Sequence, residues 1–265
     1  MADAQNAAQI GDHETWLHLI PGVRDLDHAL VGALTNDGHG FLFGTEIHRM
    51  PHVTGLILVA ALIIIVAMMY KKRASGEAGI VPAKSFGIRG FVDGILDFTR
   101  GEMSQVMGEA AAKRFLPFIG AFAFIILFSN LIGLVPGFLP PTESLNTTLA
   151  CSILVFLATH YYGFQVNGVE HFKHMGGPVL ALFPLIFVIE VIGHLARPAS
   201  LSLRLAGNMI GDHMAVINFL DLTKLIVPVA IMGLGVIVCI VQTLVFCLLS
   251  TVYIGMALEK IDHHH

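Results

Sequence analysis

Charged side chains are scarce in this sequence. Only 13% of its 265 residues are Asp, Glu, Lys or Arg, whereas 55% are hydrophobic. A typical soluble domain has about a quarter of its residues charged, so this chain has too few charges to cover a water-soluble fold. Its mean hydropathy of +0.76 points the same way. The composition argues against an ordinary soluble domain and favours a protein whose outer surface faces lipid.

Cysteine and recognised cofactor motifs are also scarce. The three cysteines, Cys151, Cys239 and Cys247, lie in apolar runs without CxxC spacing. We interpret them as small core residues, with no disulfide framework and no thiolate metal site. The sequence has no GxxxxGK[ST] loop, so we predict no nucleotide site on this chain. We likewise predict no cofactor, no metal and no nucleic-acid partner.

Long apolar runs are plentiful, and they determine the predicted fold. About 20 mainly apolar residues are needed to cross a bilayer as a helix. Runs that can do so occupy residues 53–70, 115–135, 147–162, 178–220 and 225–258. The sequence therefore predicts an all-α integral membrane protein with about five transmembrane helices. The last two runs are longer than a hydrocarbon layer of about 30 Å requires, so we expect these helices to tilt.

The basic residues predict an orientation. Lys71, Lys72 and Arg73 follow the first run, whereas the turn 136–146 has no Lys or Arg. Cytoplasmic segments carry an excess of Lys and Arg. The basic cluster after the first run is therefore predicted to be cytoplasmic, and the turn 136–146 external. Five crossings then place the N-terminus outside and the C-terminus in the cytoplasm.

Two further regions complete the predicted organisation. Residues 1–50 are mixed in polarity and are predicted to form an extramembrane N-terminal segment, with 51–265 as one polytopic membrane domain. Residues 90–112 alternate apolar and charged positions, which predicts an amphipathic helix on the cytoplasmic surface. A loop with some helix is the alternative interpretation of that stretch.

A stripe of polar residues runs along the fourth apolar segment. Its members are Glu190, His194, Arg197, Arg204, Asn208 and Asp212. At about 100° per residue these positions fall within roughly 80° of one another on a helix. The stripe is about 33 Å long at 1.5 Å per residue. Ionisable residues inside a bilayer are costly and usually face a partner or a water-filled cavity, so the stripe predicts an ion path.

Arg204 is the most informative member of this stripe. It lies between Leu203 and Leu205, and no acidic residue occurs within four positions of it. Its partner must therefore come from elsewhere in space. Snorkelling towards a helix end is the alternative for such an arginine, and that description suits Arg197 better. Gln242, in the fifth segment, belongs either to an interhelical contact or to the ion path.

The run SLSLRLAGNMIGDHM at 200–214, with Glu190 upstream and Gln242 in the last predicted helix, resembles the a subunit in the membrane sector of rotary F-type ATP synthases. The resemblance extends over about residues 53–259. It implies a stator subunit in the bacterial inner (plasma) membrane that packs against a ring of c subunits and joins b-type peripheral stalk subunits. It implies two aqueous half-channels for protons, built by the ion-path helices 178–220 and 225–258.

The resemblance also implies roles for the residues around the arginine. Arg204 matches the family's essential arginine, which gates the passage between the half-channels by attracting the ring carboxylate into its ionised form. An opposite charge nearby favours ionisation of a carboxylate, and an arginine stays protonated throughout. Asn208 and Gln242 match polar residues near that arginine.

Other residues are assigned to one half-channel or the other. Glu190 matches a glutamate of the cytoplasmic half-channel, and Ser200 is expected near it. His194 either extends that channel or bonds a neighbouring helix. Asn130 and Asn146 are polar candidates for the external half-channel, with helix packing and capping as the alternative.

His213 is expected to line the external half-channel, because it occupies a position where the family carries Glu or His. The family often pairs this position with a His or Glu seven residues before the glutamine of the last helix, but here that residue is Gly235. The partner function can pass to Asp212, to Glu143 of the external turn, or to water.

Three other functions compete with this reading. A self-contained transporter or channel would supply an acidic partner for Arg204 from within the chain and would show internal repeats. An intramembrane metalloenzyme is suggested by the many histidines, but His171 and His174 have no HExxH motif around them. A purely structural anchor would not explain the polar stripe.

Overall fold

The computed structural model describes residues 51–74, 87–135, 138–168, 183–222 and 226–259, together with Ala29. Apart from Ala29, the predicted extramembrane segment 1–50 lies outside the described residues. So do His171 and His174. The division of the chain into segments 1–50 and 51–265 therefore stays a prediction.

The described part of the chain is entirely helical, as the sequence predicts. Its six α-helices are α3 (Pro51–Ala74), α4 (Ile88–Met107), α5 (Glu109–Gly133), α6 (Leu145–Asn167), α8 (Phe183–Leu222) and α9 (Ile226–Leu258). A short 3-10 turn, η3 (Pro141–Glu143), connects α5 to α6.

Four helices within the described residues are long and apolar enough to cross a membrane. The qualifying stretches are His52–Lys72, Glu109–Gly133, Leu145–Asn167 and Val229–Leu258. Helix α8 is the longest of all, at 40 residues, but it is not among these four. It carries the polar stripe.

The helix predicted over 90–112 differs from the one observed. Helix α4 ends at Met107, and Gly108 follows with φ of +80°, a left-handed conformation that favours glycine. A new helix, α5, begins at Glu109, six residues before the predicted start of the second span. The periodic pattern continues through the junction, which hid this break. Helix α4 is nonetheless amphipathic, since Val92 and Met103 are buried while Asp97 and Arg100 are exposed.

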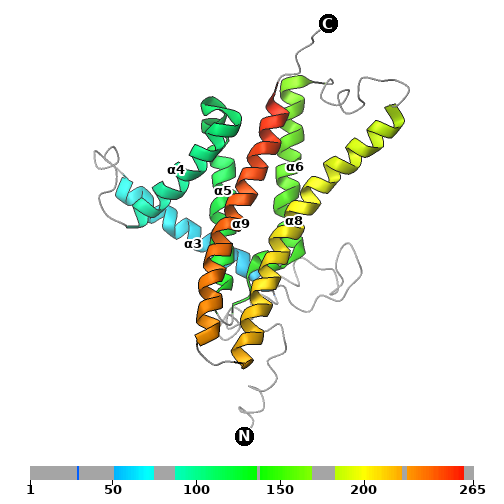
Figure 1. The fold of residues 1–265 in the computed structure, drawn as a ribbon. Coiled ribbons are helices and arrows are strands. Elements are labelled where there is room, and N and C mark those ends of the chain that lie inside the picture. Colours follow the sequence, from blue (N-terminus) through cyan, green and yellow to red (C-terminus); the bar gives the residue numbers. More distant parts are fainter. Residues whose placement is uncertain are drawn as a thin grey trace.

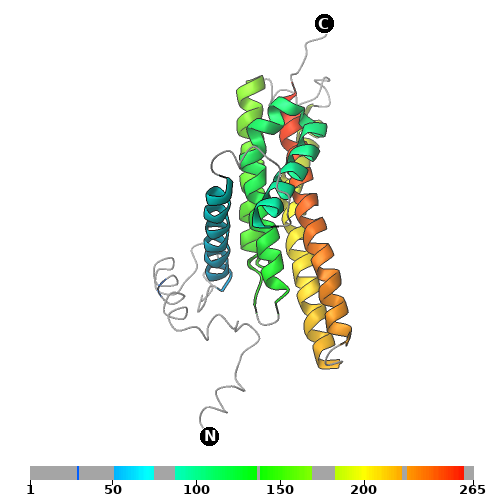
Figure 2. The same ribbon diagram turned by 90° about the vertical axis from the view of Figure 1, so that its left-hand side faces the viewer.

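The helices form layers. Figure 2 shows α3 on one side, α5 and α6 in the middle, and the long pair α8 and α9 on the other side. Helix α8 packs against α6 and α9, and α9 also packs against α4 and α5. In Figure 1, α8 diverges from α6 towards the N-terminal end of α8.

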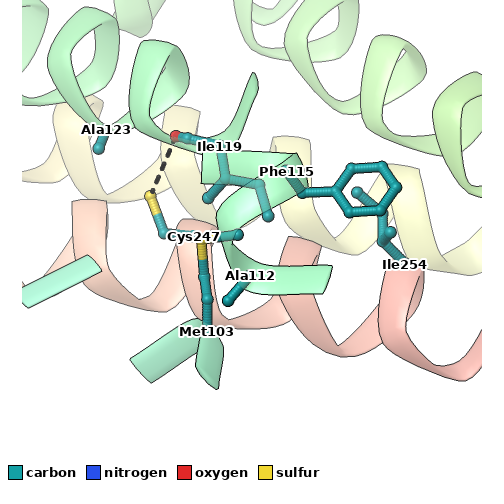
Figure 3. Close-up of a cluster of buried hydrophobic side chains, with 7 residues drawn as sticks. All are labelled: Met103, Ala112, Phe115, Ile119, Ala123, Cys247 and Ile254. Atoms are coloured by element: carbon teal, nitrogen blue, oxygen red, sulfur yellow. Dashed lines mark hydrogen bonds between the residues drawn. The ribbon is translucent and has the colours of Figure 1, made fainter. Parts of the chain in front are cut away.

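Two apolar clusters hold these layers together. The first joins α4, α5 and α9 and contains Met103, Ala112, Phe115, Ile119, Ala123, Cys247 and Ile254 (Figure 3). Within it, the Cys247 thiol points at the carbonyl oxygen of Ile119 at 4.0 Å. Cys239 and Cys247 are buried and free, whereas Cys151 is partly buried and free. The cysteines are therefore core or near-core residues without disulfide bonds.

Candidate ion path

The second apolar cluster fixes the rotation of α8. Leu201 and Leu205 are almost fully buried, where they pack against residues of α5, α6 and α9 that include Phe246. Because Arg204 precedes Leu205 by one position, burial of the two leucines turns the arginine outward. Arg204 is exposed, and so is Leu203 beside it. The sequence of α8 thus presents a cation on the outer face of the bundle.

Arg204 has no counter-ion of its own in the described part of the chain. No Asp or Glu oxygen of the described residues lies within 4.0 Å of it, whereas Arg100 and Arg89 each have an acidic partner within that limit. A cation on an apolar outer face requires a partner or water. Among the described residues of the chain, none supplies that partner.

One turn beyond the arginine, α8 is joined to α9 by a hydrogen bond. The Asn208 amide Nδ2 donates to the Gln242 Oε1 at 2.7 Å. Gln242 is only 3% exposed, and its own amide nitrogen has no hydrogen-bond partner among the described residues. The polar face of α8 therefore continues onto α9 at the level of Arg204.

Nine positions after Arg204 on α8, a histidine lies against a carboxylate. His213 Nδ1 lies 3.0 Å from Oε2 of Glu143, and both side chains are 19% exposed. Glu143 comes from η3, the turn between α5 and α6. Of the partners left open by the sequence, Glu143 is the one whose side chain reaches His213.

Two close contacts hold η3 against α5 and so fix the position of Glu143. The Thr142 hydroxyl donates to Asn130 Oδ1 at 2.7 Å, and both side chains are buried. A Cβ atom on Gly133 would lie only 2.4 Å from Cβ of Pro140, so the turn can approach α5 only because residue 133 is glycine. Asn130 thus ties η3 to α5 and also lies on the candidate path.

The glycine that replaces the expected partner on α9 has a packing reason. A Cβ atom on Gly235 would lie 2.5 Å from Cδ2 of Leu134. The leucine from the end of α5 therefore occupies the space that a side chain at position 235 would use. A side chain at position 235 would require Leu134 to move, and the carboxylate that lies beside His213 comes from Glu143 on η3.

Beside this pair is a small cavity of about 10 Å³, whose walls include Asn130, Asp212 and His213. The Asn130 Nδ2 and the Asp212 Oδ2 are buried and have no hydrogen-bond partner among the described residues. A cavity of about 10–15 Å³ with two or more polar partners is enough for one water molecule. One side of the pocket thus offers a donor and an acceptor to a bound water.

At the opposite end of α8, Glu190 and His194 form a second pair. Oε1 of Glu190 lies 3.4 Å from Nε2 of His194. Ser200 is exposed, and its hydroxyl donates to the Arg197 carbonyl at 3.1 Å, not to Glu190. Asn146, on the first turn of α6, is exposed, and within the described structure it makes no hydrogen bond to the other candidate residues.

No sequence pattern pointed to two residues that lie beside His194 and Arg197. His160 of α6 contacts the His194 ring with a centroid separation of 5.2 Å. The Arg197 guanidinium lies over the ring of Tyr253 on α9, 5.5 Å from its centroid. Neither His160 nor Tyr253 belongs to the polar stripe, since each comes from a neighbouring helix. Within the described residues, no group of three or more His, Cys, Asp or Glu is arranged to hold a metal ion.

Comparison with protein families decides the identity. The family model described as ATP synthase A chain matches residues 53–255. The chain belongs to the ATP synthase A chain family. The match covers all six helices except the ends of α3 and α9, so the resemblance seen in the sequence is confirmed, including the F-type membrane sector.

Relatives of known name support the same family over most of the chain. ATP synthase subunit a of Sorangium cellulosum is 39% identical over 249 residues, which cover 92% of this chain and 94% of that protein. ATP synthase subunit a 2 of Syntrophotalea carbinolica is 46% identical over 222 residues, 84% and 88% of the two chains. ATP synthase subunit a of Bdellovibrio bacteriovorus is 42% identical over 218 residues, 82% and 94% of the two chains. This member of the ATP synthase A chain family is therefore a multi-pass membrane protein similar to bacterial a subunits.

Proposed function

We propose that the chain is the stator subunit of a proton-translocating ATP synthase and couples proton flow to rotation and ATP synthesis. Arg204 is the electrostatic gate between two aqueous half-channels that reach a ring of c subunits from opposite sides. The chain carries no nucleotide site in this proposal, and ATP chemistry belongs to other subunits.

The observation that carries the proposal is the position of Arg204 between two histidine–carboxylate pairs. Glu190 lies 14 positions before it and His213 nine positions after it, which at 1.5 Å per residue is about 21 Å and about 14 Å along α8. Each pair contains groups that can exchange protons with water. Between them stands an outward-facing cation with no counter-ion from the described chain.

The charge of Arg204 explains why protons cannot pass straight through. When a ring carboxylate comes within about 4–6 Å of the guanidinium, its ionised form is favoured, so the carboxylate releases its proton. A guanidinium stays protonated and cannot carry the proton past itself. A proton must therefore enter through one half-channel, travel round with the ring, and leave through the other half-channel. The membrane potential supplies free energy for this movement, since each charge that crosses about 100 mV releases roughly 2.3 kcal/mol.

The face around Arg204 suits a partner helix. Gly207 and Gly211 lie three and seven positions after the arginine, and a Cβ atom at either would meet no atom within 4 Å. Small residues allow the backbones of membrane helices to approach closely. We assign this face, with Arg204 and Asn208, to the ring of c subunits.

The remaining residues divide between the two sides. Glu143 and His213, with Asp212 and Asn130 at the adjoining cavity, line the external half-channel. Glu190 and His194 line the cytoplasmic one, with Ser200 between them and Arg204. Asn146 lies at the external mouth. Helix α8 then makes a fifth, tilted crossing of the bacterial inner membrane, with the N-terminus outside and the C-terminus in the cytoplasm, and b-type stalk subunits hold the chain in place.

The proposal is tested by replacing Arg204 with Ala and with Lys in the complete complex. After assembly has been verified, ATP-driven acidification of inverted membrane vesicles is measured. We expect Arg204→Ala to abolish pumping. Arg204→Lys should impair it strongly, because an ammonium is a compact point charge that can lose its proton. Arg114→Ala is the matched control, since Arg114 stacks on Phe115 and Tyr162 away from α8.

Pumping by Arg204→Ala at the native rate would show that the arginine has only a structural role and would overturn the proposal. Proton transport by the purified chain alone would favour a self-contained transporter instead.

A further inference from the structure

Three ionisable side chains meet where α6 and α8 begin to separate. His194 Nε2 lies 3.4 Å from Oε1 of Glu190 on the same helix. The His194 ring also meets the His160 ring of α6 edge-on, with centroids 5.2 Å apart and an interplanar angle of 69°. His160 therefore joins the cytoplasmic pair as a third member from a different helix.

The hydrogen bond of His160 determines which of its nitrogens is basic. Its Nδ1 lies 3.0 Å from the carbonyl oxygen of Phe156. A carbonyl oxygen only accepts, so the ring nitrogen is the donor and carries the hydrogen. In the neutral ring, Nε2 is then the nitrogen with the lone pair that takes up a proton.

The two imidazoles line a shared cavity of about 10 Å³, together with Arg197 and Tyr253. This volume is about what one water molecule needs. Among the described residues, the charged and titratable groups next to the pair are Glu190 and Arg197 from α8 and Tyr253 from α9. The pair of rings thus has one carboxylate and one guanidinium beside it within the described structure.

The exposed fraction of the side chain falls from Glu190 to His194, which is nearer to Arg204 along α8. The Glu190 side chain is 43% exposed and the His194 side chain 13%. In Figure 1, the diverging end of α8 lies at the opposite end of the bundle from the turn at η3. In the orientation proposed above, Glu190 is the member nearest the cytoplasm, and the imidazoles lie between it and the arginine.

We propose that His160 and His194 form an imidazole pair that collects protons for the cytoplasmic half-channel. This inference rests on the proposed function. A proton arriving by way of Glu190 binds the lone pair of one neutral imidazole, which becomes positive. The ring returns to its neutral form when the proton passes on towards the ring carboxylate. In synthesis the same steps run in reverse, and no other bond changes. Either ring can bind the proton, and the edge-on contact with His160 also holds the His194 ring in place.

The pair can be tested by the pH dependence of pumping. His160→Phe keeps an aromatic ring at the contact but removes the base. In inverted vesicles the cytoplasmic side faces the medium, so its pH can be varied directly. We expect ATP-driven pumping by His160→Phe to fall several-fold relative to the native complex at alkaline pH, where protons are scarce. At acidic pH, where water supplies enough protons, it should approach the native rate.

Chemical rescue separates proton transfer from packing. His160→Ala leaves room for a small diffusible base, so we expect added imidazole to restore its pumping at alkaline pH. His160→Phe fills that room and should not respond. His160→Gln provides a polar, non-titrating variant if either of the others fails to assemble. Tyr161→Phe is the matched control, because Tyr161 is the 66% exposed neighbour outside the cavity.

Equal loss of pumping at every pH, or no response of His160→Ala to imidazole, would reduce His160 to a packing residue and overturn the inference. Arg204→Ala is measured in parallel. If it abolishes pumping while the His160 variants behave as native, the proposed function stands and the imidazole pair does not. If Arg204→Ala pumps normally, the proposed function itself fails, whatever the histidines show.

Discussion

The carboxylate of Glu143 lies 3.0 Å from Nδ1 of His213, although the two residues are 70 positions apart in the sequence. The turn η3 packs against α8 and brings the glutamate to the histidine, and the buried contact between Thr142 and Asn130 holds this turn in place. The position of a short turn therefore determines the chemistry at one end of the candidate path.

Replacing Glu143 with Gln should slow proton uptake from the external side. Glutamine keeps the size of the side chain but cannot bind and release a proton as a carboxylate does. We expect proton-driven ATP synthesis to fall while assembly stays intact. The double variant Glu143→Gln/His213→Ala should be no slower than the worse single variant, because the two residues act together. Additive losses would show that they act separately.

Gly133→Ala should displace the η3 turn. The added methyl group would meet the rigid ring of Pro140 at 2.4 Å, and such overpacking typically costs about 1–3 kcal/mol. We expect lower thermal stability of the assembled complex and weaker external proton uptake. Gly94→Ala is the matched control, since a Cβ atom there meets nothing within 4 Å. Because alanine is the better helix former by about 1 kcal/mol, that control should be neutral or stabilising.

Breaking the contact between Asn208 and Gln242 should affect stability and pumping differently. Asn208→Leu leaves the buried Gln242 without its hydrogen-bond donor, which costs about 0.6–2 kcal/mol in a membrane helix bundle. The double variant Asn208→Leu/Gln242→Leu leaves no unpaired amide, so its thermal stability should recover in part. Its pumping should not recover, because the polar surface beside Arg204 is lost. Recovery of pumping would assign the pair to helix packing alone.

The ion pair between Arg100 and Glu109 gives a contrasting expectation. It spans the break between α4 and α5, but the two side chains are 48% and 61% exposed. The carboxylate raises the pKa of Arg100, which leaves the guanidinium charged at every accessible pH. Exposed pairs contribute little and are screened by salt. Glu109→Gln should therefore leave both assembly and pumping unchanged, at low salt and at high salt. A clear loss of assembly or pumping would show that the junction at Gly108 depends on this pair.

The sequence predicted the helices well because bilayer thickness and apolar run length leave few choices. It also placed Arg204 and Asn208 on one face, since their spacing follows from helix geometry. What it missed depends on neighbouring helices. His160 and Tyr253 belong to no motif, and their relation to α8 appears only when α6 and α9 pack against it. The break at Gly108 was missed because a single glycine does not interrupt an amphipathic pattern.

The choice among partners for His213 was likewise open in the sequence. It depends on Pro140 approaching Gly133, which positions η3, and on Leu134 lying beside Gly235, 101 positions further along the chain. Close contacts of this kind leave no periodic signal. Position 235 showed only that the usual partner was missing, not which residue lies beside His213.

The outward cation on α8 also has a consequence for biogenesis. An arginine left in a bilayer without a counter-charge costs from about 2.5 to more than 10 kcal/mol. A newly inserted chain without the ring proposed as its partner would carry that cost, with glycine backbone at Gly207 and Gly211 exposed to lipid. Orphan copies should therefore be short-lived substrates for membrane proteases, and the abundance of this chain in a cell should follow the supply of its carboxylate-bearing partner.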